Sequence, residues 1–298
     1  MKNILTIIFR LTVACLLAGL VMGIAFIATN KAKKHNMHVH EHKVMLSLLG
    51  YSAKNPAPES VAMHPVYRYL VGEGEELATG YLLPLRDGAF SFVTIDLAGA
   101  FVAQTPVALA VEKAREAEDR SQAISAAIGV EKTLRYADQT ILVTNGGKRT
   151  AYLLPGKFPG FKTFIAAMLA LDQNFTILGV EIMEHEEDPG LGGEIVQNYF
   201  KKQFKGKPLE TVKKLEVVKT PLPEEYRQAL EADKSGLKAE EVARIEEQYK
   251  DGDIYALTGA TISSRSVTNG VKAMVKKFAY RLAILDRVLV EQHIATPF

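Results

Sequence analysis

The segment Leu257–Ser264 constrains the fold more than any other part of this chain. It has the sequence Leu-Thr-Gly-Ala-Thr-Ile-Ser-Ser, and apolar residues recur at helical spacing directly after it. These apolar residues are Val267, Val271, Met274, Val275, Phe278 and Leu282. The pattern predicts an amphipathic C-terminal helix that begins near Ser263 or Ser264.

The start of such a helix suits a phosphate group. Its first N–H groups lack intrahelical partners, and the helix dipole places positive charge at this end. Gly259 would let the backbone come close to a ligand, and Ala260 would leave the approach uncrowded. Thr261 would then hold a hydroxyl where the phosphate lies. An ordinary helix cap made of Ser and Thr is the alternative interpretation.

A second pattern covers Gly179–Gly192. Residues Ile177–Met183 alternate as a strand does, and His-Glu-Glu-Asp-Pro-Gly then predicts a turn. Glycines on both sides of Leu191 would let the loop backbone lie flat against a planar ring, with Leu191 over one face. Taken alone, these residues fit a polar hairpin loop with an acidic tip at least as well.

Together and in this order, the two segments resemble the FMN-binding domain of the G subunit of the Rnf electron-transport complex. The C subunit of the sodium-pumping NADH:quinone reductase shares that domain. Thr-Gly-Ala-Thr before Ile-Ser-Ser looks like its flavinylation motif, and His185–Gly192 looks like its His-x-Glu-Thr-Pro-Gly-Leu-Gly signature. The resemblance implies that a flavin transferase esterifies the phosphate of FMN to Thr261.

The resemblance also implies which residues surround the cofactor. They are Thr258, Gly259, Ala260, Ser263, Ser264, His185, Glu187, Pro189, Gly190, Leu191 and Gly192. Pro159-Gly160-Phe161-Lys162 stands where the family often has a Gly-Tyr-Gly-like turn, which adds Gly160 and Phe161 as candidate contacts.

Two positions depart from the family pattern. Tyr255 stands where the family usually has Asp, three residues before the first hydroxyl of the motif, although Asp251 and Asp253 lie close by. Asp188 stands where Thr is common. If Asp188 pointed at the ring, its charge would disfavour the anionic reduced flavin.

The implied function is that of a membrane-anchored flavoprotein subunit of an Rnf-type complex, an ion-translocating ferredoxin:NAD oxidoreductase. It would relay electrons without turning over a substrate of its own, so no catalytic residue is expected. The other membrane subunits and the flavin transferase are its implied partners. Two alternatives stay open: a C-type subunit of a sodium-pumping NADH:quinone reductase, and a flavin-free assembly or scaffold subunit with the same fold.

The segment Ile4–Thr29 predicts a single membrane anchor. Leu11–Ala28 runs eighteen residues without a charge, which as a helix covers about 27 Å. Ala25-Phe26-Ile27-Ala28 lacks the small-x-small pattern of a cleaved signal peptide, which favours a retained anchor. Gly19 and Gly23 have the spacing of a helix-packing motif or are incidental small residues.

The flanking charges slightly favour a cytoplasmic body. The resemblance implies the opposite: a single-pass protein of the inner (cytoplasmic) membrane with its soluble domain on the periplasmic or outer face. We follow the resemblance, because a difference of one basic residue is a weak signal.

The soluble region predicts an α+β fold, with a mixed sheet-and-helix FMN-binding domain. Gly-Tyr-Leu-Leu-Pro before Phe90–Asp96 recurs 71 residues later as Ala-Tyr-Leu-Leu-Pro before Phe161–Ala167, which suggests a duplicated half-sheet or two similar hairpins. Val107–Ile128 predicts a helix ending near Gly129, and Glu224–Tyr249 a surface insertion of two helices, broken at Ser235-Gly236. The expected divisions are an anchor (1–34), an N-terminal soluble part (35–148) and an FMN-binding domain (149–298) with the insertion at 220–250.

Other functions find no support in the sequence. The net charge is +2, which gives no reason to expect nucleic acid binding, and no nucleotide-binding glycine loop follows a strand. Cys15 is the one cysteine, so a Cys-based metal site is excluded. His35, His38, His40 and His42 would point to one side of an extended segment, where they form either a metal site or a polar stalk.

Overall fold

The computed structural model describes the backbone of residues 2–74 and 76–298, and the side chains of all of these except 2, 3, 28, 31, 34 and 35. The chain separates into two compact units, one ending at Ser47 and one running from Leu48 to Phe298. The division expected at residue 148 falls in a hairpin of the second unit and stays a prediction.

The first unit consists of the long helix α1 (Lys2–Leu48) as far as Ser47. Its segment Ile4–Ile27 has a mean hydropathy of 2.4, and none of it is buried. At 1.5 Å per residue, these 24 residues span about 36 Å, enough to cross a bilayer.

The histidine-rich segment belongs to this same helix, so the expected extended segment is wrong. Along a helix, neighbours two apart point to nearly opposite sides, so among the histidines with described side chains His38 and His42 share a side and His40 does not. The side chain of His35 lies outside the described residues. Within the part of the chain that is described, no group of three or more potential ligands is arranged to hold a metal ion.

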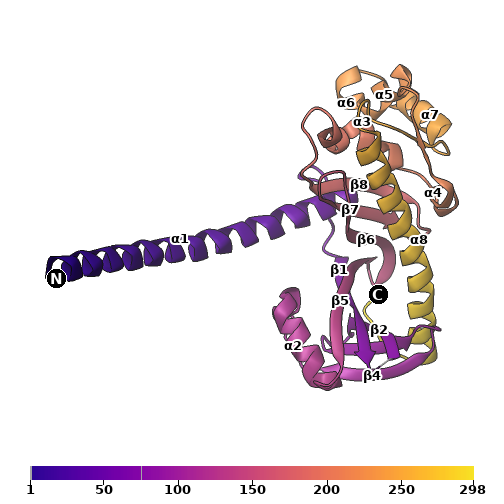
Figure 1. The fold of residues 1–298 in the computed structure, drawn as a ribbon. Helices are drawn as coiled ribbons and strands as arrows, with labels where there is room; N and C mark the ends of the chain where they lie inside the picture. The colour runs from indigo at the N-terminus through magenta and orange to yellow at the C-terminus, as the bar shows by residue number, and fades with distance from the viewer. Residues whose placement is uncertain (1, 75) are drawn as a thin grey trace. The chain divides into compact units, whose positions relative to one another are not determined.

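The second unit is built on an antiparallel sheet of eight described strands in the order β4-β3-β2-β1-β5-β6-β7-β8 (Figure 1). The strands are β1 (Val61–Glu73), β2 (Glu76–Pro84), β3 (Phe90–Asp96), β4 (Phe101–Val107), β5 (Thr133–Asn145), β6 (Lys148–Pro159), β7 (Phe164–Asp172) and β8 (Ile177–Glu184). The order consists of two four-strand meanders, each running consecutively along the sheet, and β1 pairs with β5 to join them.

This topology fits the sequence repeat. The two predicted strands Gly80–Pro84 and Phe90–Asp96 are β2 and β3, and their later counterparts are β6 and β7. The prediction for β7 is three residues early, because Gly160 N–H bonds the carbonyl of Thr163 and closes a turn first. The prediction for β8 is confirmed to within one residue.

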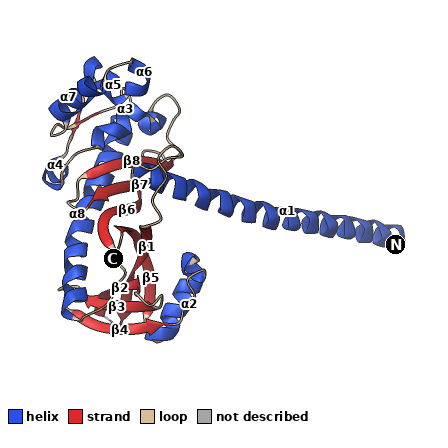
Figure 2. Cartoon of the chain, turned by 180° about the vertical axis from the view of Figure 1, so that it is seen from behind, coloured by secondary structure: helices blue, strands red, loops and turns tan. Residues whose placement is uncertain are grey.

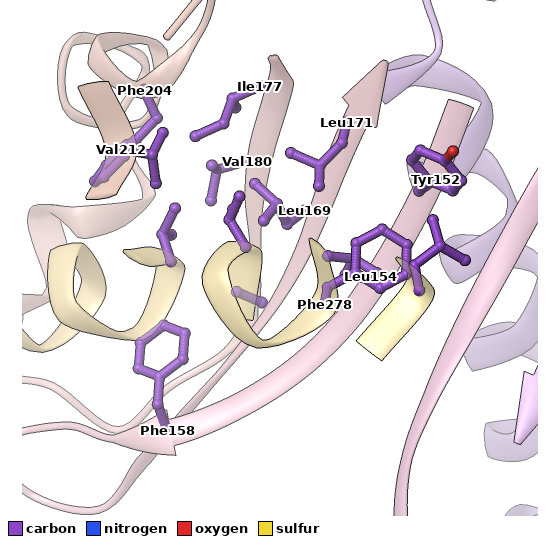
Figure 3. Packing of buried hydrophobic residues seen from close by; sticks show 14 of the residues in the cluster. Tyr152, Leu154, Phe158, Leu169, Leu171, Ile177, Val180, Phe204, Val212 and Phe278 are labelled. Atoms are coloured by element: carbon purple, nitrogen blue, oxygen red, sulfur yellow. The ribbon is translucent and has the colours of Figure 1, made fainter. Parts of the chain in front are cut away.

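The 31-residue helix α8 (Thr261–Glu291) runs along one face of the whole sheet, from β8 to β4, as both ribbon views show (Figures 1 and 2). The predicted apolar stripe of α8 is confirmed, and it packs against both meanders. Val93 and Ile95 of β3 belong to the same buried cluster as Leu285, Val288 and Ile294 near the C-terminus. Figure 3 shows the other end of this layer, where side chains of β6, β7 and β8 face α8.

The opposite face of the first meander is covered by α2 (Ala117–Ile128), after a short 3₁₀ turn at Lys113–Arg115. Tyr69, Phe92 and Ile124 are buried in this second cluster. The prediction of a helix from Val107 is wrong by ten residues. Val107 itself pairs with Phe90 as the last residue of β4, and residues 108–116 form a connection that contains the 3₁₀ turn, so the α-helix begins only at Ala117.

After β8 the chain forms short elements beside the sheet. They are a 3₁₀ turn (Gly192–Val196), α3 (Asn198–Lys201), a second 3₁₀ turn (Lys202–Phe204), α4 (Leu209–Lys214), β9 (Val217–Val218), α5 (Glu224–Leu230), α6 (Ala232–Ser235), α7 (Ala239–Tyr249) and β10 (Ile254–Tyr255). Strands β9 and β10 pair in parallel. The break predicted at Ser235-Gly236 is confirmed, since Gly236 has φ 72°. A further interruption at Glu231 makes three helices instead of two.

Lys207 holds the end of α7 in place through hydrogen bonds to the carbonyl groups there. Its side chain is 1% exposed, and Nζ donates to the carbonyls of Tyr249 (3.3 Å), Lys250 (2.8 Å) and Gly252 (2.5 Å), where α7 ends. A cation at a helix C-terminus is favoured by the dipole, and each carbonyl would otherwise lose its donor. Burial lowers the pKa of Lys207 to about 8, although Asp251 and Asp253 act in the opposite direction.

Replacing Lys207 by Met is expected to lower the free energy of unfolding by about 2 kcal/mol, because three carbonyls lose their donor. Between pH 8 and 10.5 the unfolded wild type holds the lysine proton more tightly than the folded one. The stability of wild type relative to Lys207→Met should therefore rise with pH in this window. Denaturant titrations at several pH values measure it. Lys205→Met, at an exposed neighbour, should change little.

Candidate functional site

Helix α8 begins at Thr261, two to three residues earlier than predicted, with Ala260 as the residue before it. Ser263 and Ser264 lie buried inside the first turn instead of capping it. The Ser264 hydroxyl donates to the Ala260 carbonyl (2.9 Å) and accepts from Leu257 N–H (3.0 Å). These internal bonds fix the turn and leave Thr261 as the first helical residue.

The backbone around Thr261 has the features that an anion needs. The first backbone hydrogen bond of the helix runs from Ser264 N–H to the Ala260 carbonyl (3.0 Å), so the N–H groups of residues 261–263 precede it. Gly259 is exposed and has φ 76°, a left-handed conformation that favours glycine. Thr258 is exposed beside it, and Thr261 is half-buried. A phosphate at the Thr261 hydroxyl would therefore meet backbone donors.

Glu187 ties three separate segments together at this end of α8. Its side chain is 4% exposed. Oε1 accepts hydrogen bonds from the N–H groups of Phe161 (2.7 Å) and Lys162 (3.2 Å), and Oε2 accepts one from the Ser263 hydroxyl. The carboxylate thus joins the turn after β6, the loop after β8 and the first turn of α8.

Two glycines allow these segments to come so close. A Cβ on Gly192 would lie 2.5 Å from Ser263 Oγ and 2.8 Å from Glu187 Oε2. A Cβ on Gly160 would lie 2.5 Å from Glu187 Oε1. Any other residue at either position would push the Glu187 carboxylate away from its donors, so both glycines are required by packing.

The remaining loop residues lie around the outside of this junction. Leu191 is 48% exposed, and its Cδ2 lies 3.0 Å from where a Cβ on Gly259 would be, so Leu191 stands beside the Thr261 turn. Pro189 and Gly190 are exposed. His185 accepts a hydrogen bond at Nδ1 from Glu187 N–H (3.2 Å), which leaves Nε2 as the protonated nitrogen of the neutral ring.

Asp188 forms an ion pair with Lys162, a residue that sequence reasoning did not assign a role. Both side chains are about half-exposed. Because the lysine charge stands directly against the carboxylate, it compensates the negative charge that replaces the family's usual hydroxyl. The hydrogen bond to Asp188 raises the pKa of Lys162, so the ammonium form is kept.

Four exposed apolar side chains lie on the three segments that Glu187 connects, and only two of them were predicted from the sequence. Leu191 and Phe161 were candidates, whereas Ile262 (56% exposed) and Phe164 (54% exposed) were not. Ile262 follows Thr261 directly, and Phe164 opens β7 beside the Gly160 turn. Ile262 could have been found from the sequence, because it is an apolar residue at the start of α8 that lies outside the stripe facing the core.

Tyr255, which replaces the family's usual aspartate, belongs to β10. Its N–H donates to Gln203 Oε1 (2.8 Å), and its carbonyl accepts from Gln203 Nε2 (3.3 Å). Asp253 accepts from Glu216 N–H (2.9 Å) and Asp251 from the Thr211 hydroxyl (3.0 Å). Both aspartates therefore stabilise the segment around residues 211–216, where each already has a bonding partner.

Comparison of the whole chain with known proteins points to the same segments. Residues 160–276 match the family model of the FMN-binding domain. This segment is therefore similar to FMN-binding domains. It contains the Gly160 turn, the Glu187 loop and the first half of α8, which are the three parts that Glu187 connects.

The chain is also 32% identical over 132 residues to the G subunit of the proton-translocating ferredoxin:NAD(+) oxidoreductase complex of Clostridium ljungdahlii. That alignment covers 44% of this chain and 55% of the relative, so the chain spans about half the length of the curated relative it matches. The resemblance indicated by the two motifs is thereby confirmed.

Two crystal structures are similar to 48% of the chain. NqrC of Shewanella oneidensis has 22% identity, a TM-score of 0.34 and 57% of its own chain covered. The C subunit of the Na(+)-translocating NADH-quinone reductase of Parabacteroides distasonis has 19% identity, a TM-score of 0.31 and 61% covered.

Proposed function

We propose that this protein is a membrane-anchored flavoprotein subunit that relays electrons in an Rnf-type ferredoxin:NAD oxidoreductase complex, with FMN esterified to Thr261. The observation that carries the proposal is the position of Thr261 as the first residue of α8, ahead of the first backbone hydrogen bond of the helix. The FMN-binding domain and the relative from the ferredoxin:NAD complex support the same function.

Each part of the site has a distinct task in this proposal. Thr261 Oγ carries the phosphate, and the N–H groups of residues 261–263 donate to it. The exposed side chains of Leu191, Ile262 and Phe161 offer apolar surface to a flat ring. Glu187 positions the three segments and stays out of contact with solvent. When bound, FMN supplies one- and two-electron redox chemistry, and the protein supplies attachment and orientation.

The apolar segment Ile4–Ile27 anchors the protein in the inner membrane as a single span. The soluble unit then lies on the periplasmic or outer face, as the family resemblance implies. A covalent bond suits that location, because FMN lost outside the cytoplasm could not be replaced readily. The partners are the other membrane subunits of the complex and, during maturation, a flavin transferase.

The test replaces Thr261 by Ala in the full chain, produced in the bacterial membrane together with a flavin transferase. Wild type should fluoresce yellow-green on a denaturing gel, and its Thr261 peptide should carry the mass of FMN less water. Thr261→Ala should lose both signals completely and keep its melting temperature. Thr220→Ala, which removes an exposed hydroxyl outside the motif, should keep both signals.

A fluorescent Thr261→Ala band would refute the attachment site. An unmodified wild-type peptide would support the competing hypothesis, a flavin-free scaffold subunit of the same fold, which rests on Tyr255 in place of aspartate. A C-type subunit of a quinone reductase would pass the same test and is distinguished by the proteins that co-purify.

A further inference from the structure

A pocket of about 830 Å³ lies between α8 and the sheet, where β1 and β5 join the two meanders. Ligand-binding pockets usually enclose about 300–1,000 Å³. The helix side of the pocket runs from Ser266 to Leu285, about 28 Å along the axis. The pocket is therefore long enough to hold an extended molecule.

Its walls are largely apolar. Val66 of β1, Leu142 of β5 and Leu154 of β6 line the sheet side, and Phe278 and Leu282 line the helix side. Phe158 on β6 and Met274 on α8 continue this surface toward the first half of α8. An alkyl chain laid along these side chains would lose contact with water on the side that faces them.

One cluster of charges interrupts the apolar lining. Asp138 on β5 accepts hydrogen bonds from Arg68 Nε on β1 (2.9 Å) and from the Arg281 guanidinium on α8 (2.7 Å). One carboxylate facing two guanidinium groups leaves a surplus positive charge. Lys157 and Lys277 also line the pocket and add to that surplus. The electrostatic complement is a single anionic group.

We propose that this pocket binds a long-chain carboxylate, with its alkyl chain against the apolar walls and its head group at Arg68 and Arg281. The long pocket matches an extended chain, and the single basic cluster matches one anionic end. The residues that hold Thr261 and Glu187 in place are not among those that line the pocket in the described part of the chain. The pocket and the Thr261 turn are therefore neighbouring sites with different linings, which approach each other at Pro159 and Ser266.

The experiment uses the full chain in lipid nanodiscs and a palmitate analogue with a photoreactive diazirine on its alkyl chain. After irradiation, peptide mapping should find the label on residues 266–285 and 154–158. Ala273, which lines the pocket on α8, is replaced by Phe to fill it, and this variant should reduce labelling of these peptides about tenfold. Ala283→Phe, on the exposed face of the same helix, should label as wild type does.

Competition tests the head group on the wild-type chain. Unlabelled palmitate should displace the probe, whereas methyl palmitate, which has the same chain without the charge, should not. Equal competition by the ester overturns the anionic assignment. Label confined to α1, or equal labelling of the two phenylalanine variants, overturns the pocket as a binding site. If Ala273→Phe does not fold, Ala273→Leu replaces it, and the competition result decides independently.

Discussion

Replacing Glu187 by Ala is expected to lower the free energy of unfolding by about 3 kcal/mol, because three donors, one of them the buried Ser263 hydroxyl, lose their acceptor at once. They are the N–H groups of Phe161 and Lys162 and the hydroxyl of Ser263. Without the carboxylate, the loop with Leu191 and the turn with Phe161 are no longer held against α8. Covalent flavin per mole of protein should fall strongly as well, since the surface presented to FMN and to the transferase is no longer fixed.

The matched control is Glu186→Ala, which removes the same group from the exposed neighbour and should leave stability and flavin content near wild type. Glu187→Gln keeps one acceptor oxygen and should give an intermediate loss. Denaturant unfolding and flavin absorbance of the purified chain measure both properties. If Glu187→Ala and Glu186→Ala behave alike, the carboxylate does not hold this junction.

Replacing Asp138 by Ala is the second large effect we expect, a loss of about 2 kcal/mol after allowance for its partial exposure. The change leaves Arg68 and Arg281 facing each other without an anion between them. Burial acts to raise the pKa of Asp138, but the hydrogen bond from Arg68 and the charge of Arg281 outweigh it and hold the pKa below its ordinary value.

The sign of the pH dependence follows from this lowered pKa. Above the ordinary value of 3.8 the carboxylate is charged in both states, and its stabilising contribution is complete. As the pH falls below 3.8, the unfolded state takes up the proton first, so the difference between wild type and Asp138→Ala should shrink. Asp233→Ala removes an exposed ion pair with Lys202, whose charged atoms are 3.9 Å apart. It should lower the free energy of unfolding by about 0.5 kcal/mol or less at any pH. An equal cost for both variants would contradict the structural role of Asp138.

Local pattern was enough to predict much of the fold. Strands β2, β3 and β8 follow from alternation and turn residues, and α8 follows from an apolar stripe that recurs over many turns. The pairing of β1 with β5 could not be predicted, because it depends on contacts between segments about 70 residues apart. The wrong start at Val107 has the same cause, since only the pairing with Phe90 makes that residue part of a strand.

In the candidate site, too, some features could be predicted from local sequence and others could not. The motif residues around Thr261 and Leu191 could be found because glycines and hydroxyls at fixed spacing carry a chemical meaning. The family signature selects Glu187 over Glu186 by its spacing from His185, but nothing in the sequence shows that Glu187 is buried at the centre of the junction while Glu186 is exposed. Likewise, the pocket beside Asp138 combines residues from four strands and α8, and no single stretch of sequence contains it.

The reach of α8 across both meanders has a consequence for how the protein is made. The apolar face of the first four strands, including Val93 and Ile95, is covered by Leu285, Val288 and Ile294, which a ribosome adds nearly two hundred residues later. Until then, this hydrophobic surface is exposed to solvent and can form non-native contacts or aggregate. A chain that lacks its last two dozen residues would therefore leave the apolar face of its first strands uncovered, even though the Glu187 loop and the Thr261 turn are both present.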